Sequence, residues 1–123
     1  MGKVVEIVHD IFWVGAVDWH RRIFDSFIPL PYGTSYNAYL VVGKSKIALV
    51  DTVNPGFEDV LFEKIEQIVK PEKIDYVIMN HAEPDHASGI QEVLLRAKNA
   101  KLVTTRKGVE MAEAFYGVPP EKT

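Results

Sequence analysis

The chain has 123 residues, of which 47% are hydrophobic and 25% are charged, and its formal net charge is −3. These values are typical of one globular domain and exclude a disordered or collagen-like chain. Without a basic block, the charge gives no electrostatic reason to bind nucleic acid or an anionic membrane.

Cysteine is absent from the sequence, which excludes disulfides, thiolate metal sites and a cysteine nucleophile and fits a cytoplasmic protein. The first residues lack the apolar core of a signal peptide. The longest uncharged stretch, residues 26–43, holds two prolines, two glycines and several polar residues. A helix that spans a bilayer does not tolerate so many turn-forming and polar residues, so we predict no membrane segment.

The first part of the chain is predicted to form strands. Val4–Val8 and Phe12–Ala16 are short β-branched or aromatic runs that predict a strand pair. Residues 18–33 are predicted to be irregular, with several aromatic residues and two prolines. Ser35–Val42 is predicted to turn through a glycine-containing connection into Ile47–Asp51, which makes a hairpin.

From residue 57 onward, helices alternate with strands. Helical spacing of apolar residues predicts a helix over residues 57–69, which Pro71 ends. The pattern then predicts a strand Tyr76–Met79, a helix Ser88–Ala97, a strand Leu102–Thr105 and a helix Lys107–Tyr116. This order predicts an α+β fold, a mixed sheet with helices on one face. The other face would be apolar and uncovered, and such a sheet needs another layer.

The segment Asn80–Gly89 carries the chemistry. It follows an apolar strand and precedes a helix, so it lies where open sheets place ligands. Residues two apart in an extended loop point the same way, so His81 and Glu83 could bind one metal. Asp85 and His86, adjacent residues expected to diverge at the helix start, suit a second metal nearby.

Each of these residues also has a structural explanation. Asp85 is a good N-cap for the following helix. A lone His81 or His86 would be a packing or surface histidine, and Glu83 alone would be a solvated charge. Because two histidines and two carboxylates converge within six residues, metal ligation is the better hypothesis.

The motif His81-x-Glu83-x-Asp85-His86 resembles the metal motif of the metallo-β-lactamase superfamily, which usually reads His-x-His-x-Asp-His. Glutamate in the second position is similar to the flavodiiron proteins, also called A-type flavoproteins or rubredoxin:oxygen oxidoreductases. The likeness extends over several other segments of the chain. These are residues 14–19, 21–25, 28–31, 33–39 and 48–52.

The resemblance implies that residues 1–123 are the amino-terminal part of a metallo-β-lactamase-like domain, the first half of an αββα sandwich, with no flavodoxin-like domain present. It implies a di-iron centre that reduces dioxygen or nitric oxide. FMN in a flavodoxin-like domain would supply electrons, and a rubredoxin-type partner would feed that FMN. Family members resemble head-to-tail homodimers. Replacing an imidazole by the Glu83 carboxylate moves preference from zinc toward iron or manganese, which agrees with this reading.

The sequence also departs from the family pattern. By resemblance, two further histidines and a bridging aspartate should follow, and only His81, Glu83, Asp85 and His86 can be carried over. His9 and His20 match no family motif, and no glycine-rich loop for FMN is visible. Asp51 is expected to brace the metal loop, with a strand-terminal turn aspartate as the alternative. We therefore expect an incomplete di-iron site, inactive alone, and no FMN bound by this chain.

Three functions remain open on the sequence alone. The first is a fragment or truncated form of a flavodiiron reductase. The second is a metallo-hydrolase of the same superfamily, against which Glu83 argues. The third is a metal-free half-domain that acts as an assembly or interaction module. In each case the uncovered sheet face is expected to pair with a second copy or with the remainder of a longer protein.

Overall fold

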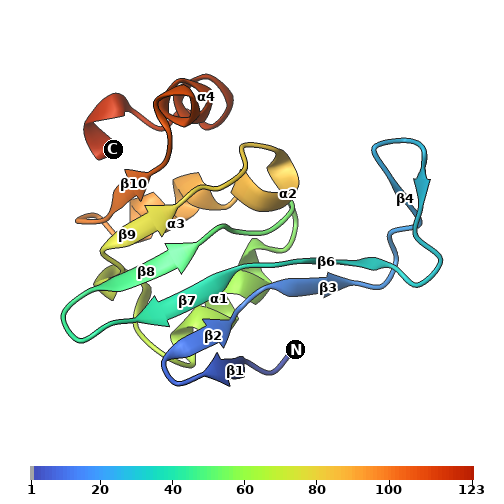
Figure 1. Cartoon of the computed structure of the whole chain (residues 1–123), viewed down its shortest axis with the longest axis horizontal. Helices are drawn as coiled ribbons and strands as arrows, with labels where there is room; N and C mark the ends of the chain where they lie inside the picture. Colours follow the sequence, from blue (N-terminus) through green and yellow to red (C-terminus); the bar gives the residue numbers. More distant parts are fainter. Residues whose placement is uncertain (1) are drawn as a thin grey trace.

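The main sheet is mixed and six-stranded, in the order β1-β2-β7-β8-β9-β10 (Figure 1). The computed structural model describes residues 2–123. The strands are β1 (Val5–Val8), β2 (Ile11–Trp13), β7 (Tyr39–Val42), β8 (Ile47–Val50), β9 (Tyr76–Ile78) and β10 (Lys101–Val103). The first four pair antiparallel, and β8, β9 and β10 run parallel. The mixed sheet and the α+β class are as the sequence predicts.

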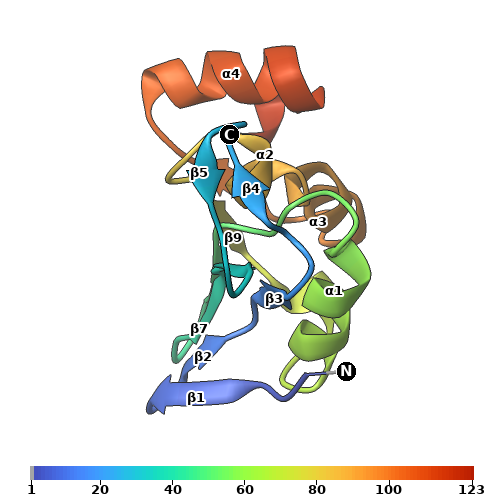
Figure 2. The ribbon, with the colours of Figure 1, turned by 90° about the vertical axis from the view of Figure 1, so that its right-hand side faces the viewer.

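Helices cover one face of this sheet. The helices are α1 (Glu58–Glu66), α2 (Pro84–Ala87), α3 (Ile90–Arg96) and α4 (Arg106–Tyr116), with short 3-10 turns at Pro71–Lys73 and Pro120–Lys122. Figure 2 shows α1 and α3 against one face, and Figure 1 shows α4 beyond the edge strand β10. α4 follows β10, the last strand of the sheet, and therefore lies at this edge.

The core lies between the sheet and these helices. Strand residues alternate between the two faces, and the row Leu40, Leu49, Val77 and Leu102 is buried on the helix side. It packs with buried residues of α1 and α3 such as Leu61. Burying each such side chain stabilises the fold by about 1.5–3 kcal/mol.

The opposite face carries a second apolar layer, and no helix of residues 2–123 covers it (Figure 2). We call it the open sheet face, and all of its residues are half-buried or exposed. It comprises Ile11, Tyr39, Val41, Ala48, Val50, Tyr76, Ile78 and Val103. An apolar face of this size marks a surface that packs against another layer.

Two predicted strands are each divided between separate sheets. The predicted strand Phe12–Ala16 continues only to Trp13 in the main sheet, and β3 (Ala16–Asp18) pairs instead with β6 (Thr34–Tyr36). Likewise Ser35–Val42 is β6 followed by β7. The two breaks lie opposite each other, since the Val14 amide donates to the Ala38 carbonyl at 2.9 Å. The chain therefore leaves the main sheet and returns to it at the same place.

The segment predicted to be irregular forms the outer part of an arm. Residues 16–36, which we call the arm, extend away from the sheet (Figure 1) and contain the small hairpin β4 (Ile23–Phe24) and β5 (Ile28–Pro29). At its base the Tyr36 hydroxyl donates to Asp18 Oδ2 at 2.7 Å. Gly33 has φ +83°, and a Cβ there would lie 2.3 Å from the Asp18 carbonyl oxygen. Glycine is required at this turn.

A buried lysine ties α1 to the link between β2 and β3. Lys64 is only 3% exposed. Its Nζ donates to the Gly15 carbonyl oxygen at 2.5 Å and lies 4.2 Å from the centre of the Trp13 ring. Burial lowers the pKa of Lys64, because desolvation penalises the charged ammonium. The carbonyl and the ring replace part of the lost hydration.

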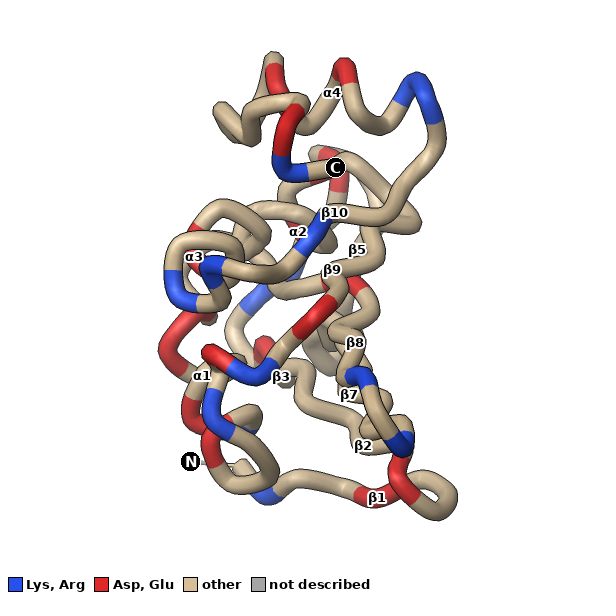
Figure 3. Tube along the Cα trace, turned by 90° about the vertical axis from the view of Figure 1, so that its left-hand side faces the viewer, with Lys and Arg blue, Asp and Glu red and all other residues tan. Residues whose placement is uncertain are grey.

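Charges of both signs are distributed over the helices. Figure 3 shows acidic and basic residues interspersed along the trace, including on α1, α3 and α4. Within residues 2–123, no helix has the length and hydropathy needed to cross a bilayer.

Candidate metal centre

The loop that follows β9 lies beside the end of β8. Because β8 and β9 are parallel and adjacent, their carboxyl ends meet at one edge of the sheet. β8 leads directly into Asp51, and β9 leads into Met79 and the segment Asn80–Gly89. The sheet therefore brings Asp51 and the predicted metal loop together, although about thirty residues separate them in the sequence.

The helix after the loop begins earlier than the sequence predicts. Pro84, not Ser88, is the first helical residue, with Glu83 in the N-cap position and extended backbone. Asp85 therefore lies inside the first turn, and the N-cap role considered for it is wrong. The predicted helix Ser88–Ala97 corresponds to α3, and the short helix α2 before it was not predicted. Between the two helices, Ser88 Oγ donates to the Val53 carbonyl at 2.6 Å.

Three of the predicted ligands form one cluster. One ligand atom from each of His81, Glu83 and Asp85 lies within 4.8 Å of the other two. His81 Nε2 is 3.6 Å from a Glu83 carboxylate oxygen, as expected for residues two apart in an extended segment. This spacing is one that a single cation bridging the three side chains can occupy.

The fourth predicted ligand, His86, adjoins the cluster. Its Nε2 lies 3.3 Å from Asp85 Oδ2, so these neighbours converge rather than diverge as predicted. Both lie in the first turn of α2. The His81 and His86 ring centres are 5.4 Å apart. All four side chains therefore share one site.

Asp51 fixes the start of the loop. It is 8% exposed, has φ +59°, and accepts hydrogen bonds from the Asn80 amide (2.8 Å) and the Asn80 side chain (3.4 Å). Its Oδ2 also lies 3.7 Å from Nδ1 of His86. That nitrogen is buried and makes no hydrogen bond within the described residues. Asp51 is thus in a position to orient both the start of the loop and the His86 ring.

Thr52 fixes the other end of the loop. Its amide and its Oγ1 both donate to the His86 carbonyl, at 2.8 and 2.9 Å, and its Oγ1 accepts from the Gly89 amide at 3.1 Å. Thr52 is fully buried. The sequence did not single out Thr52, although its place directly after Asp51 at a strand end was a signal.

The other two histidines lie elsewhere. His9 belongs to the turn between β1 and β2, where Glu6, His9 and Asp10 form an exposed group. His20 lies in the arm, and its amide donates to Asp18 Oδ1. Neither belongs to the cluster of His81, Glu83 and Asp85.

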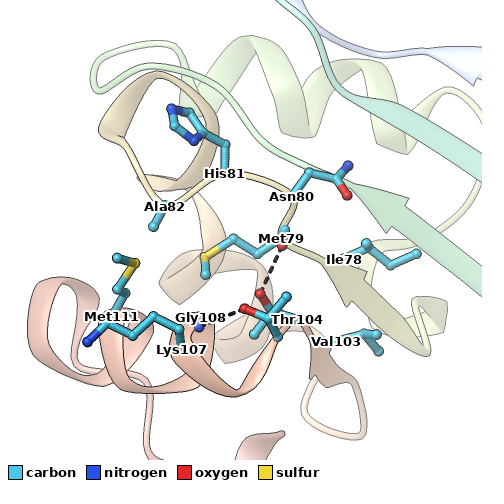
Figure 4. A pocket seen from close by; sticks show the side chains of 11 residues that line it. Ile78, Met79, Asn80, His81, Ala82, Val103, Thr104, Lys107, Gly108 and Met111 are labelled. Atoms are coloured by element: carbon cyan, nitrogen blue, oxygen red, sulfur yellow. Dashed lines mark hydrogen bonds between the residues drawn. The ribbon is translucent and has the colours of Figure 1, made fainter.

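Helix α4 borders the loop and leaves cavities beside it. A cavity of about 440 Å³ lies between the segment Ile78–Ala82 and the start of α4, with Met79 and Met111 side by side in it (Figure 4). A second cavity, of about 680 Å³, lies between residues 81–84 and the end of α4. Both have mainly apolar walls next to His81, so the site is open on this side.

Tyr116 joins α4 to the loop, a contact that could not be predicted from the sequence. The Tyr116 hydroxyl donates to the Ala82 carbonyl oxygen at 2.5 Å. Burial, followed by the charges of Asp85 and Glu83, raises the pKa of Tyr116. The hydroxyl therefore stays protonated at neutral pH and remains a donor.

Comparisons with known proteins identify a matching family and several proteins with similar sequences. The profile of the ODP family beta lactamase matches residues 34–122. A nitric oxide reductase of Moorella thermoacetica is 40% identical over 117 residues, which is 94% of this chain. A flavo-diiron protein of Clostridium acetobutylicum is 42% identical over 104 residues, or 85% of this chain. The chain spans 29% and 26% of the length of these two relatives.

A solved structure agrees with this relationship. The rubredoxin oxygen:oxidoreductase of Desulfovibrio gigas superposes with a TM-score of 0.88 at 33% identity, over 94% of this chain and 29% of that one. The sheet, the helices and the loop at the strand ends therefore follow an arrangement already seen in a flavodiiron enzyme.

Proposed function

Because this chain belongs to the flavodiiron branch of the metallo-β-lactamase superfamily and corresponds to its amino-terminal part, we propose that it supplies part of a di-iron site of an oxygen or nitric oxide reductase. His81, Glu83, Asp85 and His86 are the proposed ligands. The observation that carries the proposal is the approach of His81, Glu83 and Asp85 to within 4.8 Å, with His86 adjoining.

The donor set fits iron. Two carboxylates and two imidazoles make a harder and more anionic site than the three-histidine, one-aspartate pattern of the zinc hydrolases. The unpartnered Nδ1 of His86 also fits a site in which a bound cation orients the ring. By family likeness, His81 and Glu83 would hold one iron, and Asp85 and His86 the other.

The residues of this chain then have separate tasks. When bound, the iron pair would supply the redox centre at which dioxygen or nitric oxide is reduced. Glu83 and Asp85 would neutralise the positive charge of the metals. Asp51 and Thr52 would keep the loop in place, because they bind its two ends. The apolar cavities beside His81 would admit a small uncharged substrate.

Electron supply is proposed to lie outside residues 1–123. In the full-length family an FMN domain delivers electrons and a rubredoxin-type protein reduces the FMN. We expect no FMN binding by this chain, because its sequence offers no glycine-rich phosphate loop. We also propose a cytoplasmic location, for which the absence of cysteine is the only support.

The chain alone is predicted to bind iron without turning over substrate. Its other two histidines do not belong to the cluster of His81, Glu83 and Asp85, so the set of ligands stays partial and holds metal weakly. Ferrous iron would be added anaerobically, its binding measured by calorimetry, and oxygen or nitric oxide uptake followed at electrodes with a chemical reductant present. Turnover at rates typical of the family would refute the prediction.

The same metal titration, repeated with zinc, distinguishes the reductase from the two alternative functions. Preference for zinc over iron, with hydrolysis of an ester or phosphodiester, would favour a metallo-hydrolase. No binding of any divalent metal, together with an obligate oligomer, would favour the metal-free module.

The open sheet face is predicted to make the chain self-associate at micromolar concentration. Its apolar side chains remain in contact with water in the monomer, and pairing two such faces removes them from it. Val103→Lys, on this face, should shift sedimentation toward the monomer. Leu95→Lys, at an exposed position of α3, is the matched control and should leave the oligomer intact. A well-folded monomeric wild type would contradict the prediction.

A further inference from the structure

The metal loop is held firmly at both ends and at one point between them. Asp51 holds Asn80, and Thr52 holds His86 and Gly89. Within the described residues, the hydrogen bond from Tyr116 to Ala82 is the only one that reaches residues 81–85 from outside the loop. Without it, residues 81–85 have no hydrogen bond to the described residues outside the loop.

The position of Tyr116 is itself well determined. It is the last residue of α4, which Gly117 ends in a left-handed conformation with φ +66°. The Gly117 and Val118 amides donate to carbonyls of the last turn, at 3.1 and 3.2 Å, and Val118 is buried. The start of α4 is also fixed, since Thr105 caps the Gly108 amide at 3.0 Å. The hydroxyl of Tyr116 is therefore presented by a rigid element.

Ala82 lies directly between two of the proposed ligands. Its carbonyl belongs to the peptide plane that joins it to Glu83, and rotation of that plane changes the direction of the Glu83 side chain relative to His81. Figure 4 shows the loop passing over α4, with Met79 and Met111 between them. The contact at Ala82 is the polar part of this packing.

We infer that Tyr116 is a positioning residue of the metal centre: its hydroxyl fixes the Ala82 carbonyl and thereby sets the spacing of His81 and Glu83. This inference rests on the proposed function, since it concerns the same ligands. It adds a residue from α4, the helix at the sheet edge, to a site otherwise built from the ends of β8 and β9. Residues that orient metal ligands commonly change metal affinity by 10- to 100-fold when removed.

Tyr116→Phe tests the inference, because it removes the hydroxyl and keeps the ring. The Kd of the 123-residue chain for Mn²⁺, measured by anaerobic calorimetry, should rise about tenfold. The visible absorption of bound Co²⁺ should change shape, since the ligand geometry changes. In the metal-free protein, amide exchange at residues 81–83 should become about five- to tenfold faster. Tyr76→Phe, which removes a hydroxyl on the open sheet face, should match the wild type in all three.

The outcomes are distinguishable. If Tyr116→Phe binds Mn²⁺ with the wild-type Kd and gives the wild-type Co²⁺ spectrum and exchange rates, the inference is overturned and the proposed function stands. If the wild type binds neither Mn²⁺ nor Co²⁺, the proposed function is overturned and the inference fails with it. Faster exchange in Tyr116→Phe without a change in Kd or spectrum would show a merely structural contact and also overturn the inference.

Discussion

Replacing Glu83 with glutamine should weaken Fe²⁺ binding by this chain more than about 100-fold. Glu83 approaches His81 Nε2 to 3.6 Å from the extended part of the loop, whereas Asp85 lies in α2. An amide keeps the shape of the side chain but is neutral, and hard cations prefer anionic oxygen ligands. Replacing a direct ligand should weaken metal binding more than replacing a residue that only supports a ligand.

Anaerobic calorimetry with Fe²⁺ and with Mn²⁺ would measure this loss. Glu113→Gln is the matched control, because Glu113 is an exposed glutamate of α4 and the substitution makes the same change of charge. The control should bind both metals with the wild-type Kd. Equal affinities of Glu83→Gln and Glu113→Gln would show that Glu83 is a solvated charge, as the structural explanation of this residue holds, and the proposed ligand set would be wrong.

The metal loop could be predicted from the sequence because its information is local. Residues 81–86 are consecutive, and in the extended part of the segment His81 and Glu83, two apart, point the same way whatever the rest of the chain does. The approach of Asp85 to His86 was not predicted. The bracing role of Asp51 was a harder prediction, since it depends on the parallel pairing of β8 with β9. It was reached through the family pattern, and the hydrogen bond to the Asn80 amide now gives it a physical basis.

The division of two predicted strands could not be read from the sequence. Apolar and strand-forming residues continue through both breaks, so composition alone extends each strand. What divides them is a long-range contact between Val14 and Ala38, at which the chain leaves the main sheet for the arm and returns. Contacts between residues this far apart leave no periodic signal.

The burial of Lys64 could not be predicted from the sequence either, for a different reason. It occupies a position on the buried stripe of α1, between Leu61 and Ile65. Helical spacing alone would assign it to the core, but a lysine there is normally assigned to solvent. The Gly15 carbonyl and the Trp13 ring that make its burial tolerable come from the link between β2 and β3. Only the tertiary structure supplies these partners.

Tyr36 links the arm to the core and gives the fold a dependence on alkaline pH. Its ring is 2% exposed and packs 5.4 Å from the Phe57 ring, and its hydroxyl donates to Asp18 at 2.7 Å. Burial, followed by the hydrogen bond and charge of Asp18, raises the pKa of Tyr36 from 10.0 to about 12. The folded chain therefore retains this proton at a pH where the unfolded chain has lost it.

The sign of the effect follows from this difference. Below pH 10 both states are protonated, and the stabilisation by the hydrogen bond is fully present. As the pH rises from 10 to 12, the unfolded state binds fewer protons than the folded state, so the free energy of unfolding falls. A shift of this size corresponds to a loss of about 2–3 kcal/mol from this group.

Tyr36→Phe should therefore destabilise the chain by about 2 kcal/mol near neutral pH, because the Asp18 carboxylate loses its donor. This difference from the wild type should shrink to zero or reverse as the pH approaches 12, since only the wild type loses the contribution of Tyr36. Urea denaturation of both proteins at several pH values would measure it. Tyr32→Phe, at an 85% exposed tyrosine of the arm, is the control and should follow the wild type throughout. A difference between Tyr36→Phe and the wild type that stays constant from neutral to alkaline pH would mean that the Tyr36–Asp18 hydrogen bond does not hold the base of the arm.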